Sequence, residues 1–144
     1  MQYQRILIAV DNSPHSINAA KKGFELAIAL KASVGVVYII DIMKEPVIPE
    51  TGRVSVMIQN QSQATANKVI DKLIKSYPQA GEVIRFTSEG FPKKEIVMIA
   101  KDWDADLIVM GTHGRTGLSY LILGSVSEYV IKHTNIPVMV VPLK

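Results

Sequence analysis

The chain has 144 residues, a formal net charge of +3 and 48% hydrophobic residues, a composition typical of a globular domain with its own core. It has no cysteine, which excludes disulfide bonds and thiolate chemistry. Only 6% of residues are aromatic and the basic residues are scattered, so a nucleic-acid partner is disfavoured. No apolar run is long enough for a membrane span and no signal-peptide pattern is visible, so we expect one cytoplasmic domain over residues 1–144.

The first forty residues predict a strand, a helix and a second strand. The apolar run Arg5 to Val10 ends at Asp11, as expected for a strand that is buried on both faces. Ser13, followed by a proline, predicts the N-cap of a helix. A second apolar run, Val34 to Ile40, ends at Asp41. Such a unit forms a parallel pair of strands with a right-handed crossover.

The middle of the chain predicts a loop, two helices and a short strand. Residues 41–55 contain two prolines and a glycine and show no clear period, which is typical of a surface loop. Apolar residues then recur at helical spacing, which predicts a helix from about Val56 to Tyr77 that Pro78 ends. The segment Glu82 to Thr87 predicts a strand, and Pro92 opens the next helix.

The last part predicts a strand, a glycine-rich stretch, a helix and a final strand. Asp106 to Met110 leads into Gly111–Glu128, which holds four glycines within fourteen residues. Ser125 with Glu128 three residues later fits a capping box, so we expect Ser125 to be the N-cap of a helix. The final strand is expected over Val138 to Val141.

This alternation of strands and helices predicts an α/β fold, a doubly wound parallel sheet of five strands with helices on both faces. In such sheets a ligand binds outside the carboxyl ends of the strands, where the strand order reverses. The spacing of Asp102, Asp104 and Asp106 resembles the start of a calcium-binding loop, but Leu107 and His113 stand where that loop would need glycine and glutamate. Two of the three aspartates are therefore expected to form the turn before the fourth strand.

The glycine-rich stretch predicts an anion site. Gly111, Gly114, Gly117 and Gly124 let another group approach the main chain closely. The free N–H groups and the positive dipole end of the helix that follows would attract an anion, most naturally a phosphate. The stretch is neither a P-loop nor a G-x-G-x-x-G dinucleotide fingerprint, and a G-x-S-x-G hydrolase motif is absent from the sequence.

The spacing Gly111-x2-Gly114-x9-Gly124-Ser125 resembles the ATP-binding signature of the universal stress protein family, and the similarity extends from ILIAVDNS near the start to NIPVMVVP at the end. The resemblance implies a Rossmann-like sheet of order 3-2-1-4-5, whose reversal point lies between Asp11 and Gly111. It also implies ATP with Mg²⁺ or Mn²⁺ as the ligand. A homodimer through the last strand, Ile136 to Val141, is expected from the resemblance and from the apolar, uncharged character of this edge.

Within that site, Asp11 is expected to accept from a ribose hydroxyl or to hold the divalent ion, although it could also cap the following helix. Ile39 and the end of the first strand would form the adenine slot. Arg115 could clamp a phosphate or point to solvent, whereas His15 and His133 are expected to be surface residues. The expected nucleotide-binding residues are Ala9, Val10, Asp11, Ile39, Met110, Gly111, Thr112, Gly114, Arg115, Gly117, Gly124, Ser125, Val126 and Ser127.

The expected function is regulatory. ATP occupancy would act as a switch with little or no hydrolysis, because the motif supplies binding groups but no evident base. The alternatives are a slow ATPase or an enzyme of the adenine-nucleotide α-hydrolase type, a flavodoxin-like FMN protein, and a structural dimer that binds nothing.

Overall fold

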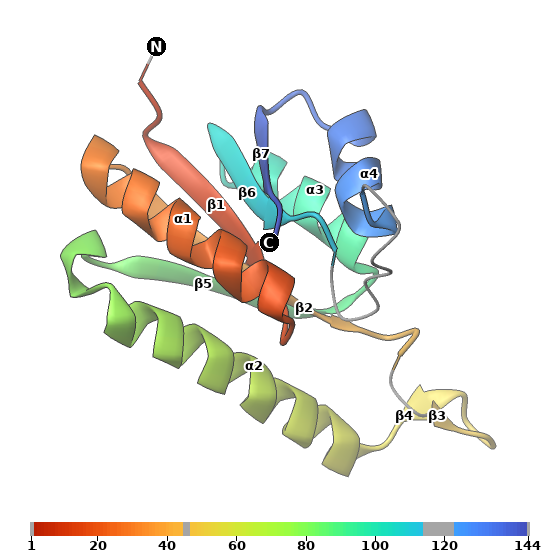
Figure 1. Cartoon of the computed structure of the whole chain (residues 1–144). Helices are drawn as coiled ribbons and strands as arrows, with labels where there is room; N and C mark the ends of the chain where they lie inside the picture. Colours follow the sequence, from red (N-terminus) through yellow and green to blue (C-terminus); the bar gives the residue numbers. More distant parts are fainter. Residues whose placement is uncertain (1, 45–46, 114–122, 144) are drawn as a thin grey trace.

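A five-stranded parallel sheet lies between two layers of helices in the computed structural model, which describes residues 2–44, 47–113 and 123–143 (Figure 1). The strands of the sheet are β1 (Arg5–Val10), β2 (Ser33–Asp41), β5 (Val83–Gly90), β6 (Leu107–Gly111) and β7 (Val138–Val141). The helices are α1 (Pro14–Leu30), α2 (Val56–Ser76), the 3₁₀ turn η1 (Pro78–Ala80), α3 (Pro92–Asp102) and α4 (Ser125–His133).

The strand order is β5-β2-β1-β6-β7, and every neighbouring pair is parallel. Numbered along the chain, the five strands run 3-2-1-4-5, so the expected Rossmann-like sheet is confirmed. The chain moves outward from β1 to β2 and β5, then returns to the other side of β1 with β6 and β7. The carboxyl ends of β1 and β6 therefore form the reversal point of the sheet.

Residues 6–10 of the central strand β1 are all apolar because helices cover both faces of the strand (Figure 1). Successive strand residues point to opposite faces. Ile6 and Ile8 pack in the cluster that includes Phe24 of α1, whereas Leu7 packs in the cluster that includes Val130 of α4. Both clusters are closed to water, and each β1 residue from 6 to 10 is at most 6% exposed.

Most element boundaries agree with the sequence predictions. Ser13 caps α1, because its side chain accepts from the Ser16 N–H at 3.2 Å. Helix α2 begins at Val56 as expected and ends one residue earlier than predicted. The predicted strand from Glu82 to Thr87 is longer in the structure and reaches Gly90.

Two local predictions are wrong. The segment expected to be irregular contains a small antiparallel hairpin of β3 (Val47–Ile48) and β4 (Arg53–Val54), which lies beside the start of α2 (Figure 1). The predicted capping box at α4 is not formed: the N-cap is Gly124, and Ser125 is already helical. The Glu128 carboxylate instead accepts from Lys132 Nζ at 2.8 Å, and this bond lowers the pKa of Glu128.

Among the described residues, no helix combines the length and apolar character that a membrane crossing needs.

Candidate functional site

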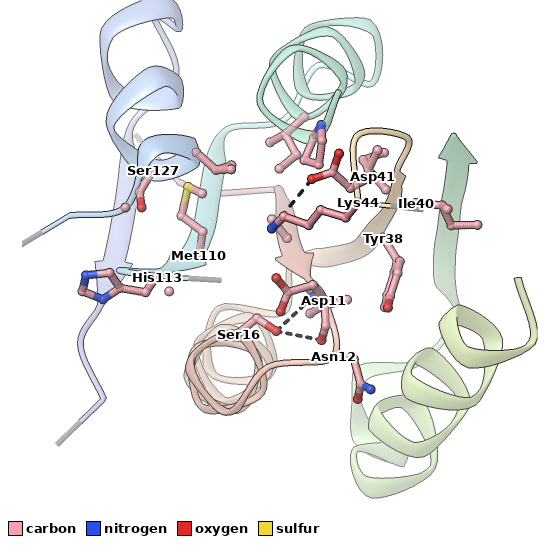
Figure 2. A pocket seen from close by; sticks show the side chains of 18 of the residues that line it. Asp11, Asn12, Ser16, Tyr38, Ile40, Asp41, Lys44, Met110, His113 and Ser127 are labelled. Atoms are coloured by element: carbon pink, nitrogen blue, oxygen red, sulfur yellow. Dashed lines mark hydrogen bonds and ion pairs between the residues drawn. The ribbon is translucent and has the colours of Figure 1, made fainter. Parts of the chain in front are cut away.

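A cavity of about 630 Å³ opens at the carboxyl ends of β1, β2 and β6, at the reversal point of the sheet (Figure 2). Helices α1, α2, α3 and α4 also contribute to its wall. Its lining includes ten residues of the expected nucleotide site: Ala9, Val10, Asp11, Ile39, Met110, Gly111, Gly124, Ser125, Val126 and Ser127. Thr112 is described but does not line the cavity, while Gly114, Arg115 and Gly117 lie outside the described residues.

Asp11 lines the cavity and is held in place by the first turn of α1. Its Oδ1 accepts from the Ser13 N–H at 2.9 Å. The Asp11 N–H donates to Ser16 Oγ at 2.9 Å, and the Ser16 hydroxyl donates back to the Asp11 carbonyl at 2.9 Å. The expected capping role therefore belongs to Ser13, and Asp11 supports the turn just before the helix. A carboxylate held this way needs little reordering to meet a ligand.

Packing within the protein itself explains why two positions of the motif are glycine. A Cβ on Gly111 would lie 2.8 Å from the main-chain oxygen of His15, and a Cβ on Gly124 would lie 3.1 Å from that of Thr112. Gly124 has φ of −77°, so it does not need a left-handed conformation. Close packing of main chain on main chain therefore accounts for both glycines, without reference to a ligand.

The Thr112 carbonyl joins the end of β6 to the start of α4. It accepts from the Gly124 N–H at 2.6 Å and from the Ser127 hydroxyl at 2.8 Å. Ser127 is only 2% exposed, so its hydroxyl proton serves this junction rather than a ligand. Ser125 is exposed and carries the hydroxyl at the α4 N-terminus that can meet a phosphate.

The start of α4 brings main-chain donors to the cavity. The first-turn N–H groups of a helix have no acceptor within the helix, and they carry the positive end of its dipole. Ser125, Val126 and Ser127 occupy this turn and all line the cavity. The helix end faces the carboxyl ends of β1 and β6, which is where the sequence predicted an anion site.

Sequence reasoning missed a second polar wall of the cavity. Asp41 ends β2, as Asp11 follows β1, and Lys44 Nζ lies 3.8 Å from Asp41 Oδ2. Asp41 could have been predicted to line the site because it stands at the end of a strand. Lys44 could not, because its segment shows no helix or strand periodicity. The lining residues absent from the predicted set are Asn12, Ser16, Tyr38, Ile40, Asp41, Lys44, Gln61, Ser62, Thr65, Pro92, Ile96 and His113.

The prediction that His15 is a surface residue holds only in part. His15 is half-buried on α1 and meets the ring of His113 edge-on, with the ring centroids 5.2 Å apart. His15 Nδ1 and His113 Nε2 are buried and have no hydrogen-bond partner among the described residues. The pair packs α1 against the segment that follows β6. His133 is exposed, as expected, and stacks on Tyr129.

A divalent ion at this site would need ligand oxygens in addition to the carboxylates of the described residues. Within residues 2–44, 47–113 and 123–143, no group of three or more His, Cys, Asp or Glu side chains could hold a metal. Mg²⁺ commonly uses one or two carboxylates, several waters and the phosphates of its substrate. The Asp11 carboxylate, which lines the same cavity as the α4 N-terminus, fits this mode of binding.

Comparison with known proteins gives one consistent family. The model of the universal stress protein family matches residues 2–142. The universal stress protein MJ0531 of Methanocaldococcus jannaschii is 37% identical over 142 residues, which cover 96% of this chain and 82% of that protein. The solved structure of MJ0577, from the same organism, has a TM-score of 0.82 at 32% identity and covers 100% of this chain and 99% of that one. A universal stress protein from Archaeoglobus fulgidus, solved in complex with dAMP, shares the fold with a TM-score of 0.66 at 24% identity, covering 97% and 98% of the two chains.

Proposed function

Since the chain belongs to the universal stress protein family, we propose that it binds ATP, together with Mg²⁺ or Mn²⁺, in the cavity at the ends of β1 and β6. The observation that carries the proposal is that Asp11 and the N-terminus of α4 line one cavity of about 630 Å³. A volume of this size is typical of a small-molecule site.

The phosphates are assigned to the α4 side of the cavity. The N–H groups of the first helical turn and the exposed Ser125 hydroxyl are donors for phosphate oxygens. Gly114 belongs to the proposed site through the spacing of the motif, and Arg115 and Gly117 through their places in the glycine-rich stretch. A divalent ion, when bound, neutralises phosphate charge, and Asp11 is the residue assigned to hold it.

The adenine ring is assigned to the apolar part of the cavity. Ala9, Val10 and Ile39 supply apolar surface from two adjacent strands, and each of the three is 6% exposed. Main-chain N–H and C=O groups at the end of β2 can form hydrogen bonds with the edge of the base. The dAMP complex of the Archaeoglobus fulgidus protein supports an adenine nucleotide as the ligand class, since the two proteins share this fold.

The proposed role is a switch that responds to ATP occupancy, not an enzyme that turns ATP over. Hydrolysis needs a group that places water in line with the γ-phosphate, as well as cations on the phosphates. The site is built mainly of groups that bind, so occupancy is the function that it supports best. A slow ATPase is the competing hypothesis, and phosphate release measured over hours distinguishes the two.

Calorimetry of the nucleotide-free chain tests the proposal. Titration with Mg-ATP should give saturable heat. Asp11→Asn retains the oxygen that accepts from the Ser13 N–H but removes the charge that would hold the ion. We therefore expect about a tenfold loss of affinity in Mg²⁺, and a much smaller loss in EDTA.

Asp71→Asn is the matched control, because Asp71 is an exposed carboxylate of α2 that pairs with Arg85 and does not line the cavity. This variant should bind as the parent does. A flat trace for the parent chain at millimolar Mg-ATP would overturn the proposal.

A further inference from the structure

A short turn after β2 carries Lys44 back over the cavity. The Ile42 N–H donates to the Gly90 carbonyl at 3.2 Å, which ties the turn to the end of β5. The Met43 N–H donates to Asp41 Oδ1 at 3.0 Å, and the Lys44 N–H donates to the Asp41 carbonyl at 3.1 Å. Figure 2 shows the Lys44 side chain lying across the cavity, with its ammonium group directed toward Asp41.

The ion pair between Lys44 and Asp41 is weak by geometry. The distance from Lys44 Nζ to Asp41 Oδ2 is 3.8 Å, and the two side chains are 35% and 17% exposed. A long, partly hydrated pair of this kind contributes little to stability. The ammonium group can therefore leave Asp41 for a stronger acceptor at small cost, and the flexible stem of lysine allows the movement.

The balance of charged side chains in the cavity lining suggests a role for Lys44 in binding an anionic ligand. Among the described lining residues, the side chains that are charged at neutral pH are Asp11, Asp41 and Lys44. Two carboxylates against one ammonium leave this part of the cavity negative. A nucleotide polyphosphate adds several further negative charges, so binding requires cations nearby. Within the described lining, Lys44 is the one lysine or arginine side chain.

We propose that Lys44 is a movable counter-charge that selects nucleotides by their phosphates. Without ligand it pairs with Asp41. With ligand its ammonium group, which lies across the cavity from the β2 side where the adenine is assigned, turns to an oxygen of the phosphates on the α4 side (Figure 2). Asp41 then competes with the ligand for Lys44, so the charge of Asp41 lowers the affinity for ATP. This inference rests on the proposed function, and it adds a specificity-determining residue outside the glycine motif.

Binding of a graded ligand series tests the role of Lys44. Affinities of the whole chain for adenosine, AMP, ADP and ATP are measured by calorimetry or by competition, at one ionic strength. Lys44→Met keeps the length of the side chain and removes the charge. It should weaken ATP binding about tenfold and change adenosine binding less than about twofold, whereas Lys44→Arg should restore most of the ATP affinity.

Lys132→Met is the matched control. Lys132 is also paired with a carboxylate, at 2.8 Å from Glu128, but it does not line the cavity. This variant should bind all four ligands as the parent does. Equal losses for adenosine and ATP in Lys44→Met would show a merely structural role, and unchanged ATP affinity would show no role; either result overturns the inference.

Asp41→Asn tests the exchange itself. The substitution retains the oxygen that accepts from the Met43 N–H and removes the competing charge. ATP affinity should rise by about two- to fivefold, and the rise should be smaller when Lys44 is already methionine. A fall in ATP affinity would overturn the exchange.

Failure of this inference is distinguishable from failure of the proposed function. A parent chain that binds none of the four ligands would overturn both. A parent chain that binds ATP, and a Lys44→Met chain that binds it equally well, would overturn only the role of Lys44.

Discussion

At the scale of single residues, Gly124 connects the stability of the chain to its site. Its N–H donates to the Thr112 carbonyl at 2.6 Å, and its Cα faces that carbonyl so closely that a Cβ would lie 3.1 Å from the oxygen. The same Cβ would lie 3.4 Å from His113 Cα. Both neighbours are main-chain atoms of the segment after β6. The steric overlap of a Cβ at position 124 is therefore relieved only if this segment and α4 move apart.

Substitutions at Gly124 should therefore reduce stability as well as ligand binding. We expect Gly124→Ala to lower the free energy of unfolding by about 1–3 kcal/mol, and Gly124→Val to lower it further, because overpacking forces main-chain shifts. Urea unfolding followed by circular dichroism measures the change. An alanine variant with the stability of the parent chain would contradict the packing assigned to this glycine.

Other residues show what a sequence can and cannot supply. Asp11 and the buried strand β1 were predictable, because an apolar run and the polar residue that follows it are local patterns. The position of His15 was not, since its contact with His113 joins residues 98 positions apart. Lys44 was missed for a similar reason, because its turn is held by the Gly90 carbonyl at the end of β5.

At the scale of elements, neighbouring residues determine where most helices start, whereas a contact with a residue distant in the sequence determines the start of one helix. Ser13 and Ser55 cap α1 and α2 through their side chains, as such residues commonly do. Ser125 and Glu128 have the spacing of a capping box, yet Gly124 is the cap of α4. The bond from Gly124 to Thr112 determines that start, and a pattern within one helix cannot reveal it.

The junction between β1 and β6 at the opposite end of the sheet depends on Asp106. Its Oδ2 accepts from the N–H groups of Gln4 and Arg5 at 2.7 and 2.8 Å, and so fixes the entry of β1 beside β6. Asp106→Asn removes the charge from these bonds. It should lower the free energy of unfolding by about 1–3 kcal/mol, because hydrogen bonds to a charged group are stronger than neutral ones.

The same variant should leave nucleotide affinity unchanged, because Asp106 does not line the cavity. Asp102→Asn, at an exposed carboxylate near the end of α3, is the control and should change neither quantity. Chemical denaturation and calorimetry of the two variants measure both effects. Loss of nucleotide affinity in a folded Asp106→Asn chain would contradict the view that Asp106 stabilises one end of the sheet and takes no part in nucleotide binding at the other.

At the scale of the whole molecule, the strand order determines where the site lies. It brings Asp11 and Gly111 together at the carboxyl end of the sheet, although 100 positions separate them in the sequence. This much of the site followed from the sequence once the strand order was known from the family resemblance. The wall formed by α2 and the turn after β2 did not, because its residues carry no motif.

The outer edge of β7, an end strand of the sheet, is the surface for which we propose self-association. Ile108 donates to the Pro137 carbonyl at 2.9 Å, and the register pairs Ile108 with Val138. In a parallel ladder this pattern turns the main-chain groups of Val138 and Val140 away from β6. An apolar, uncharged edge with outward main-chain groups favours pairing with a second copy.

Val140 is the position at which to test the dimer. Met139 and Val141 pack against the core on one side of the sheet and Val138 on the other, so charges at those positions would disturb the fold itself. Val140→Lys puts a charge at the proposed seam, and Val140→Pro removes an outward N–H. Both should convert a dimer into a monomer in sedimentation equilibrium. A parent chain that is monomeric at micromolar concentration would refute the proposed dimer.

The central claim is that an adenine nucleotide occupies the cavity with its phosphates at the start of α4. The most direct measurement is an amide chemical-shift titration of the ¹⁵N-labelled, nucleotide-free chain with Mg-ATP. The account predicts saturable shifts for Asp11 and for the amides of Ser125 to Ser127, with little change at Arg5 and Asp106 at the other end of the sheet. No saturable shift, or shifts confined to residues outside the cavity, would contradict it.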